Sequence, residues 1–85
     1  ERVACPWEAK GIVMRRFNDY CQREHPDSPV DRTDGIKLVL DEVEWVLLLS
    51  DPDRPLLHVY AEAAHPARAS DLVWNYTTLI EEMQK

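Results

Sequence analysis

Residues 44–63 read "EWVLLLSDPDRPLLHVYAEA", in which two apolar runs flank a polar tip at residues 50–55. The tip carries two carboxylates and one guanidinium. In the first run, Trp45 and Leu47 fall on one side and Val46 on the other, because successive side chains of a strand point to opposite faces. A strand that is apolar on both faces is typical of the middle of a sheet. We therefore predict a central strand, a short loop and a second strand within this segment.

The beginning of the chain predicts a short strand followed by a helix. Val3 and Cys5 alternate with other residue types, which indicates a strand, and Pro6 ends it. Pro6 also suits the first turn of a helix, where its missing N–H is not needed. Over residues 7–24, apolar side chains recur at helical spacing, namely Val13, Phe17, Tyr20 and Cys21. Gly11 weakens this helix, and we expect it to permit close packing against a neighbour.

A second hairpin and a final helix complete the predicted fold. Residues 30–40 read "VDRTDGIKLVL", where Asp34-Gly35 favours a type I′ turn with positive φ at both central positions. After the last strand, His65-Pro66 opens a helix with an amphipathic pattern, formed by Ala69, Leu72, Val73, Tyr76, Leu79, Ile80 and Met83. The element order is β-α-β-β-β-β-α. This order predicts an α+β fold with one mostly antiparallel sheet and both helices on one face.

The amino-acid composition limits the kinds of molecule that we expect this protein to bind. The net charge of −6, from 16 acidic and 10 basic residues, disfavours nucleic acid, because a phosphate backbone attracts Lys and Arg. No apolar run approaches the roughly 20 residues of a membrane span, and the charged start does not resemble a signal peptide. We therefore expect a cytoplasmic protein without nucleic-acid or membrane partners. Because the chain begins with Glu1 rather than Met, we also expect one domain, residues 1–85, cut from a longer protein.

We interpret the cysteine and tryptophan residues as structural rather than functional. Cys5 and Cys21 fit no metal-binding spacing, so we expect reduced, partly buried thiols, with an internal disulfide as the alternative. Given the acidic charge, we interpret Trp7, Trp45 and Trp74 as core or helix-packing aromatics rather than a stacking platform for bases.

Three segments resemble a known family. "TDGIKLVL" at residues 33–40, residues 45–63 and the closing helix resemble the C-terminal domain of the α-D-phosphohexomutases, the phosphomannomutase and phosphoglucomutase enzymes. The opening "CPWEAKGIVMRRF" resembles proteins that fuse a mannose-1-phosphate guanylyltransferase-type region to a mutase-like region. The resemblance implies a TATA-binding-protein-like fold. It also implies upstream domains of the same chain as partners, which would hold the Mg²⁺ and the phosphorylated serine of an active mutase.

In that family, a loop of this domain holds the phosphate of the sugar and usually reads Arg-Pro-Ser-Gly/Asn-Thr-Glu-Pro. A guanidinium pairs with phosphate through two hydrogen bonds, and hydroxyl and loop N–H groups donate to the remaining oxygens. Here Leu49 stands in place of the Arg, Asp51 in place of the Ser and Asp53 in place of the Thr. Arg54 replaces the Glu, and only Pro55 keeps its place. Residues 49–55 therefore align with the family loop position by position, but the residues that would bind phosphate are replaced.

Electrostatics predict that this loop binds phosphate weakly or not at all. A carboxylate ~6 Å from a dianionic phosphate raises the free energy by ~1.4 kcal/mol at the dielectric constant of water and by ~5 kcal/mol at an effective dielectric constant of about 20. Two aspartates face one arginine here. The degenerate substrate-phosphate loop that we predict comprises Ser50, Asp51, Asp53, Arg54 and His58.

Other interpretations of the loop are also open. Asp51 and Asp53 resemble the Asp-x-Asp element of a magnesium loop, but two carboxylates without a phosphate hold Mg²⁺ weakly, so we expect no metal or cofactor in this domain. A plain turn, in which Asp51 accepts neighbouring backbone N–H groups, is the structural interpretation. His58 is either a residual phosphate contact or a half-exposed sheet histidine beside Tyr60.

Two functions follow from these observations. The first is a C-terminal domain of a phosphohexomutase-like sugar-phosphate enzyme, which closes over a hexose phosphate during phosphoryl transfer. The second is a non-catalytic structural or regulatory module within a sugar nucleotidyltransferase fusion, which the loop substitutions favour. We predict no catalytic residue, because Ser28, Ser50 and Ser70 lack a neighbouring base. An unrelated ferredoxin-like or RNA-binding sandwich is a third interpretation that the charge disfavours.

Overall fold

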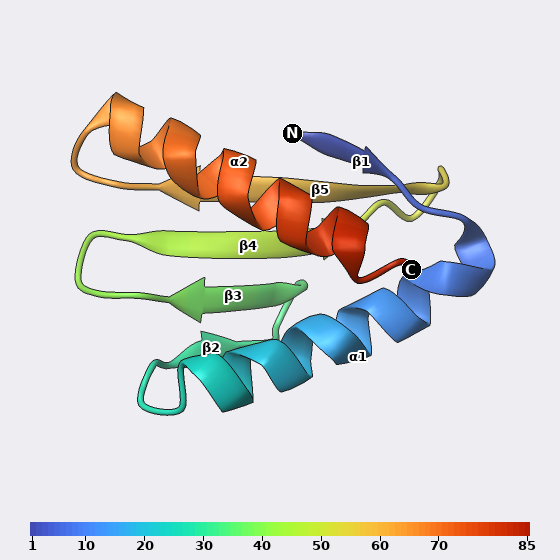
Figure 1. Ribbon diagram of the computed structural model, residues 1–85, viewed down its shortest axis with the longest axis horizontal. Coiled ribbons are helices and arrows are strands. Elements are labelled where there is room, and N and C mark those ends of the chain that lie inside the picture. Colours follow the sequence, from blue (N-terminus) through green and yellow to red (C-terminus); the bar gives the residue numbers. More distant parts are fainter.

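The chain folds into one five-stranded antiparallel sheet and two helices, which confirms the predicted α+β class and element order (Figure 1). The computed structural model describes residues 1–85. Neither helix combines the length and the apolar character that a bilayer crossing demands. The elements are β1 (Arg2–Ala4), α1 (Trp7–Glu24), β2 (Val30–Asp31), β3 (Ile36–Val39), β4 (Trp45–Ser50), β5 (Leu56–Glu62) and α2 (Pro66–Glu82).

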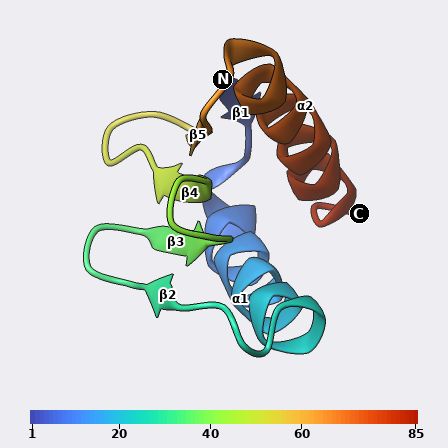
Figure 2. The same cartoon turned by 90° about the vertical axis from the view of Figure 1, so that its left-hand side faces the viewer.

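Strand β4 lies in the middle of the sheet, as its two apolar faces predict. The strand order is β1-β5-β4-β3-β2, and all neighbours are antiparallel. Both helices lie against the same face of the sheet, and no helix or strand covers the other face (Figure 2). We refer to these two sides as the covered face and the open face.

The core forms between the covered face and the two helices. Val46 and Leu48 on β4 are each 1 % exposed, and the register places Leu38 opposite Val46 and Val59 opposite Leu48. Each helix adds one stripe at a spacing of four residues, namely Val13, Phe17 and Cys21 on α1 and Leu72, Tyr76 and Ile80 on α2. These alternating and four-residue spacings are the periods of strand and helix, so the sequence pattern and the packing agree.

The predicted type I′ turn at Asp34-Gly35 is wrong. No residue in the chain has a positive φ, which that turn requires. The last pair of the β2–β3 ladder joins Asp31 to Lys37, so the connection is longer than a two-residue turn. The Asp31 carboxylate accepts a hydrogen bond from the N–H of Thr33 at 2.9 Å and shapes the start of this loop.

The two glycines have different structural roles from those predicted. Gly35 is needed for close approach, because a Cβ there would clash with the backbone oxygen of Leu48. Gly11 lies exposed on α1, and a Cβ there would meet no atom within 4 Å. The prediction that Gly11 permits close packing is therefore wrong.

The tryptophans are more exposed than predicted, whereas the cysteines are free, as predicted, and more deeply buried than predicted. Trp7 is 52 % exposed and Trp74 is 74 % exposed, so neither is a core residue. Trp45 is half-buried and lies on the open face. Cys5 and Cys21 are both buried and free.

Candidate functional site

The polar tip identified in the sequence is the loop between β4 and β5, residues 51–55, at one end of the sheet. The ladder of the two strands ends with Ser50 opposite Leu57, and the N–H of Asp51 then donates to the carbonyl oxygen of Leu56 at 3.1 Å. Two rigid neighbouring strands therefore fix both ends of the loop. The loop itself contains Pro52 and Pro55, which have no backbone N–H to offer.

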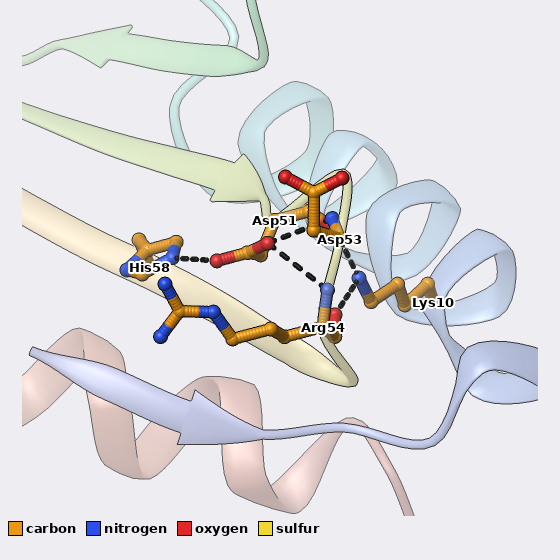
Figure 3. Close-up of polar contacts among 5 residues, drawn as sticks. All are labelled: Lys10, Asp51, Asp53, Arg54 and His58. Atoms are coloured by element: carbon orange, nitrogen blue, oxygen red, sulfur yellow. Dashed lines mark hydrogen bonds and ion pairs between the residues drawn. The ribbon is translucent and has the colours of Figure 1, made fainter.

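The Asp51 carboxylate lies at the centre of this loop. One oxygen, Oδ1, accepts hydrogen bonds from the N–H groups of Asp53 at 2.8 Å and Arg54 at 3.0 Å (Figure 3). The other oxygen, Oδ2, lies 2.9 Å from Nε2 of His58 on β5. The residue is only 9 % exposed. The carboxylate thus receives three donors and is largely removed from solvent.

These contacts keep Asp51 ionised. The hydrogen bond from His58 and those from the backbone N–H groups of Asp53 and Arg54 lower the pKa of Asp51 to about 2, against a smaller opposing effect of burial. Because an ionised carboxylate can only accept hydrogen bonds, Nε2 of His58 carries the hydrogen in this contact. The loop therefore contains one fixed negative charge.

A buried lysine braces the loop from the side of α1. Lys10 is 7 % exposed, and its Nζ donates to the carbonyl oxygen of Asp51 at 2.5 Å and to that of Arg54 at 2.6 Å. The same ammonium lies 3.9 Å from the centre of the Trp7 ring, within the range of a cation–π interaction. Sequence reasoning missed Lys10. The available signal was its position, three residues before Val13, where it extends the apolar stripe of α1.

The predicted site residues separate into two groups. Asp51, Arg54 and His58 lie together, and Figure 3 shows the Arg54 side chain extending beside His58 and Asp51. Asp53 contributes its backbone N–H, while its side chain is exposed. Ser50 points to the covered face, because it lies opposite the buried Leu57, and it is therefore not part of the cluster.

His58 also contacts its neighbour on β5. Its ring stacks beside that of Tyr60 with centroids 6.1 Å apart and an interplanar angle of 13°. His58 therefore lies beside Tyr60, as the structural interpretation has it, and also binds the loop carboxylate. Its interpretation as a phosphate contact stays a prediction.

The loop has no free backbone donor for an anion. Its three N–H groups, those of Asp51, Asp53 and Arg54, all bind acceptors of the same chain. The structure has two surface hollows, of about 340 Å³ and 200 Å³, and neither includes a residue of the loop. The arrangement is a closed turn around an internal carboxylate, with one exposed guanidinium beside it. Neither the loop nor any other part of the chain brings together three or more His, Cys, Asp or Glu side chains that could hold a metal ion.

Comparison with known proteins adds no assignment to this geometry. No protein-family model matches the chain, and no curated protein matches it. The loop and its bracing lysine are therefore the features of this structure from which a function can be proposed.

Proposed function

We propose that this chain is a phosphohexomutase C-terminal-type domain that serves as a structural or regulatory module and no longer holds a sugar phosphate. The residue resemblance supports the family, and the element order β-α-β-β-β-β-α is compatible with the TATA-binding-protein-like fold that the family implies. In this proposal the partners are upstream domains of the same cytoplasmic protein, which is of the guanylyltransferase–mutase fusion type. Mg²⁺ and the catalytic groups would belong to those domains.

One observation carries the proposal: the Asp51 carboxylate occupies the N–H groups that a phosphate would need. It accepts from Asp53 and Arg54 and binds His58 as well. A phosphate approaching this loop would meet an ionised carboxylate and no unpaired backbone donor. Repulsion between like charges and the lack of donors both oppose binding.

A second candidate function is a domain that still closes over a hexose phosphate with low affinity. The observation that favours it is the Arg54 guanidinium, which is exposed and makes no hydrogen bond within the chain. A single guanidinium can pair with a phosphate through two hydrogen bonds. The two candidates differ in whether the wild-type loop responds to a hexose phosphate.

Titration of the wild-type chain with mannose 1-phosphate, followed by amide NMR, tests the proposal. We expect no saturable chemical-shift change at residues 50–58 up to millimolar ligand. An Arg54→Gln variant is the matched control, because it removes the guanidinium of the loop without touching the hydrogen bonds of Asp51. Saturable shifts in the wild type at or below millimolar ligand, lost in Arg54→Gln, would establish the second candidate and overturn the first.

A further inference from the structure

The donors around Asp51 form an arrangement that suits a small oxyanion. Two consecutive N–H groups, from Asp53 and Arg54, point at one carboxylate oxygen, at 2.8 Å and 3.0 Å, and His58 approaches the other at 2.9 Å. Successive backbone N–H groups that converge on one point make an anion-binding concavity. The Arg54 guanidinium adds a positive charge on the same side and also lowers the pKa of Asp51. We call this set of donors the cradle.

The cradle is braced by contacts that do not involve the Asp51 carboxylate. Lys10 Nζ binds the carbonyl oxygens of Asp51 and Arg54 from beneath the loop. The N–H of Cys5 donates to the carbonyl oxygen of Pro55 at 2.9 Å, and the N–H of Asp51 donates to that of Leu56 at 3.1 Å. Because these bonds use carbonyl oxygens and the ends of the loop, they remain when the carboxylate is removed. The donors should therefore keep their direction without it.

Asp41 provides an internal comparison. Its carboxylate accepts hydrogen bonds from the N–H groups of Val43 at 2.8 Å and Glu44 at 2.7 Å, the same positions relative to the aspartate as in the loop of Asp51. No side chain donates to Asp41, and the residue is exposed. Arg68 is a nearby positive charge for Asp41, as Arg54 is for Asp51. Asp41 is thus an ordinary aspartate turn, whereas the turn at Asp51 adds a histidine, burial and a bracing lysine.

We propose that the cradle is an oxyanion site occupied by the chain's own Asp51 carboxylate, an autoinhibitory contact that excludes free anions. The inference rests on the proposed function and extends it by naming the occupant that keeps the loop closed. Its ligand class is the small oxyanion, with inorganic phosphate and formate as probes. Phosphate tests recognition of a tetrahedral anion, and formate restores the missing carboxylate.

Covalent attachment explains why free anions lose this competition. A tethered ligand has an effective concentration of about millimolar or higher, so an external anion of similar intrinsic affinity must exceed that concentration to displace it. Removing the carboxylate eliminates both this competition and the repulsion between like charges. We therefore expect phosphate to bind Asp51→Gly at least about tenfold more tightly than the wild type, which corresponds to at least about 1.4 kcal/mol.

The experiment compares Asp51→Gly, the control Asp41→Gly and the wild type in amide NMR titrations at constant ionic strength with chloride as the reference salt. In Asp51→Gly, phosphate and formate should give saturable shifts of the Asp53 and Arg54 amides and of the His58 ring. The melting temperature of this variant should rise with formate. Asp41→Gly should show neither effect at its own turn. Adding His58→Gln to Asp51→Gly should weaken phosphate binding, which a purely structural role of the histidine would not produce.

Folded Asp51→Gly without saturable shifts would overturn the inference and leave the proposed function intact. A wild type that binds phosphate as tightly as the variant would overturn both. If Asp51→Gly does not fold, Asp51→Ala replaces it, since alanine has no side-chain oxygen that could occupy the cradle. The same titrations and the same two outcomes then apply.

Discussion

At the scale of single residues, three aspartates share one function in the fold. Asp31, Asp41 and Asp51 are spaced ten residues apart, and each accepts hydrogen bonds from backbone N–H groups two or three residues later. Hydrogen bonds to the charged form lower the pKa of all three carboxyl groups. Each turn is therefore stabilised by an aspartate at its start and depends on that aspartate being ionised.

This dependence predicts a loss of stability in acid that can be assigned to Asp51. Its pKa falls from an ordinary value of 3.8 to about 2 in the folded protein. The stabilisation is fully present above the ordinary pKa and is lost as the pH falls through the folded value, because the unfolded chain binds the proton first. Thermal unfolding between neutral pH and pH about 2 should therefore show a steeper decline for the wild type than for Asp51→Asn. The control Asp27→Asn, at an exposed position, should follow the wild type.

The two glycines predict opposite responses to the same substitution. Gly11→Ala should raise the free energy of unfolding by about 0.5–1 kcal/mol, because alanine is the better helix former and its Cβ meets nothing. Gly35→Ala should lower it by about 1–3 kcal/mol, since the new Cβ would displace the backbone of β4 at Leu48. Urea unfolding of both variants measures the two values. A neutral or stabilising Gly35→Ala would contradict the close packing of β3 on β4.

The hydrogen bonds of Lys10 predict that α1 stabilises the loop between β4 and β5. In Lys10→Met the carbonyl oxygens of Asp51 and Arg54 lose a charged donor, which should lower the free energy of unfolding by about 2–3 kcal/mol. Amide hydrogen exchange should accelerate at Asp53 and Arg54 more than in the core strands. The matched control is Arg15→Met, which removes a positive charge from an exposed position of the same helix. Equal effects of the two variants would show that the lysine does not brace the loop.

At the scale of elements, the hairpin of β4 and β5 determines what the loop can bind. Leu49 lies opposite His58 on the open face, so a side chain at this position points toward the same side as the cradle. Under the proposed function, the differences from the phosphohexomutase loop therefore separate into a missing cation at Leu49 and an additional anion at Asp51.

If the proposed function holds, this separation predicts the result of introducing the residues of the phosphohexomutase loop. Leu49→Arg alone should not create binding of a hexose phosphate, because Asp51 still occupies the backbone donors and pairs with His58. The triple variant Leu49→Arg, Asp51→Ser, Asp53→Thr should bind, as it supplies a guanidinium and two hydroxyl groups and removes two carboxylates. Calorimetric titration with mannose 1-phosphate distinguishes the two. Binding by Leu49→Arg alone would mean that the Asp51 carboxylate does not block the loop.

Element types were largely predictable because periodicity depends on local spacing alone. The helix at residues 7–24 and the central strand agree with the structure, since the stripe ending at Cys21 and the alternation at Val46 follow the periods of helix and strand. The turn at Asp34-Gly35 was mispredicted for a physical reason. The glycine is required by the closeness of β4 rather than by its own φ, and a neighbouring strand is invisible to a local pattern.

At the scale of the whole molecule, contacts between residues far apart in the sequence could not be predicted from the sequence. The loop was located from the sequence, but its bracing lysine lies 41 residues away from Asp51, and no local rule joins them. The exposure of Trp74 was missed for a similar reason, because helical spacing assigns a face to each residue only when the neighbouring elements are known. The contact between Asp51 and His58 could be predicted only if the register of β4 on β5 were known.

Chemical labelling of the two buried thiols can report which part of the protein unfolds. Cys5 is 1 % exposed and Cys21 is not exposed at all, and burial raises the pKa of both, that of Cys21 to about 11. The thiolate is the nucleophile that attacks an alkylating reagent, so these side chains can be modified only after the surrounding structure has separated. Cys5 lies at the junction of β1 and α1, near the loop, and Cys21 lies at the far end of α1. The ratio of their labelling rates would therefore distinguish fraying near the loop from global denaturation without any added probe.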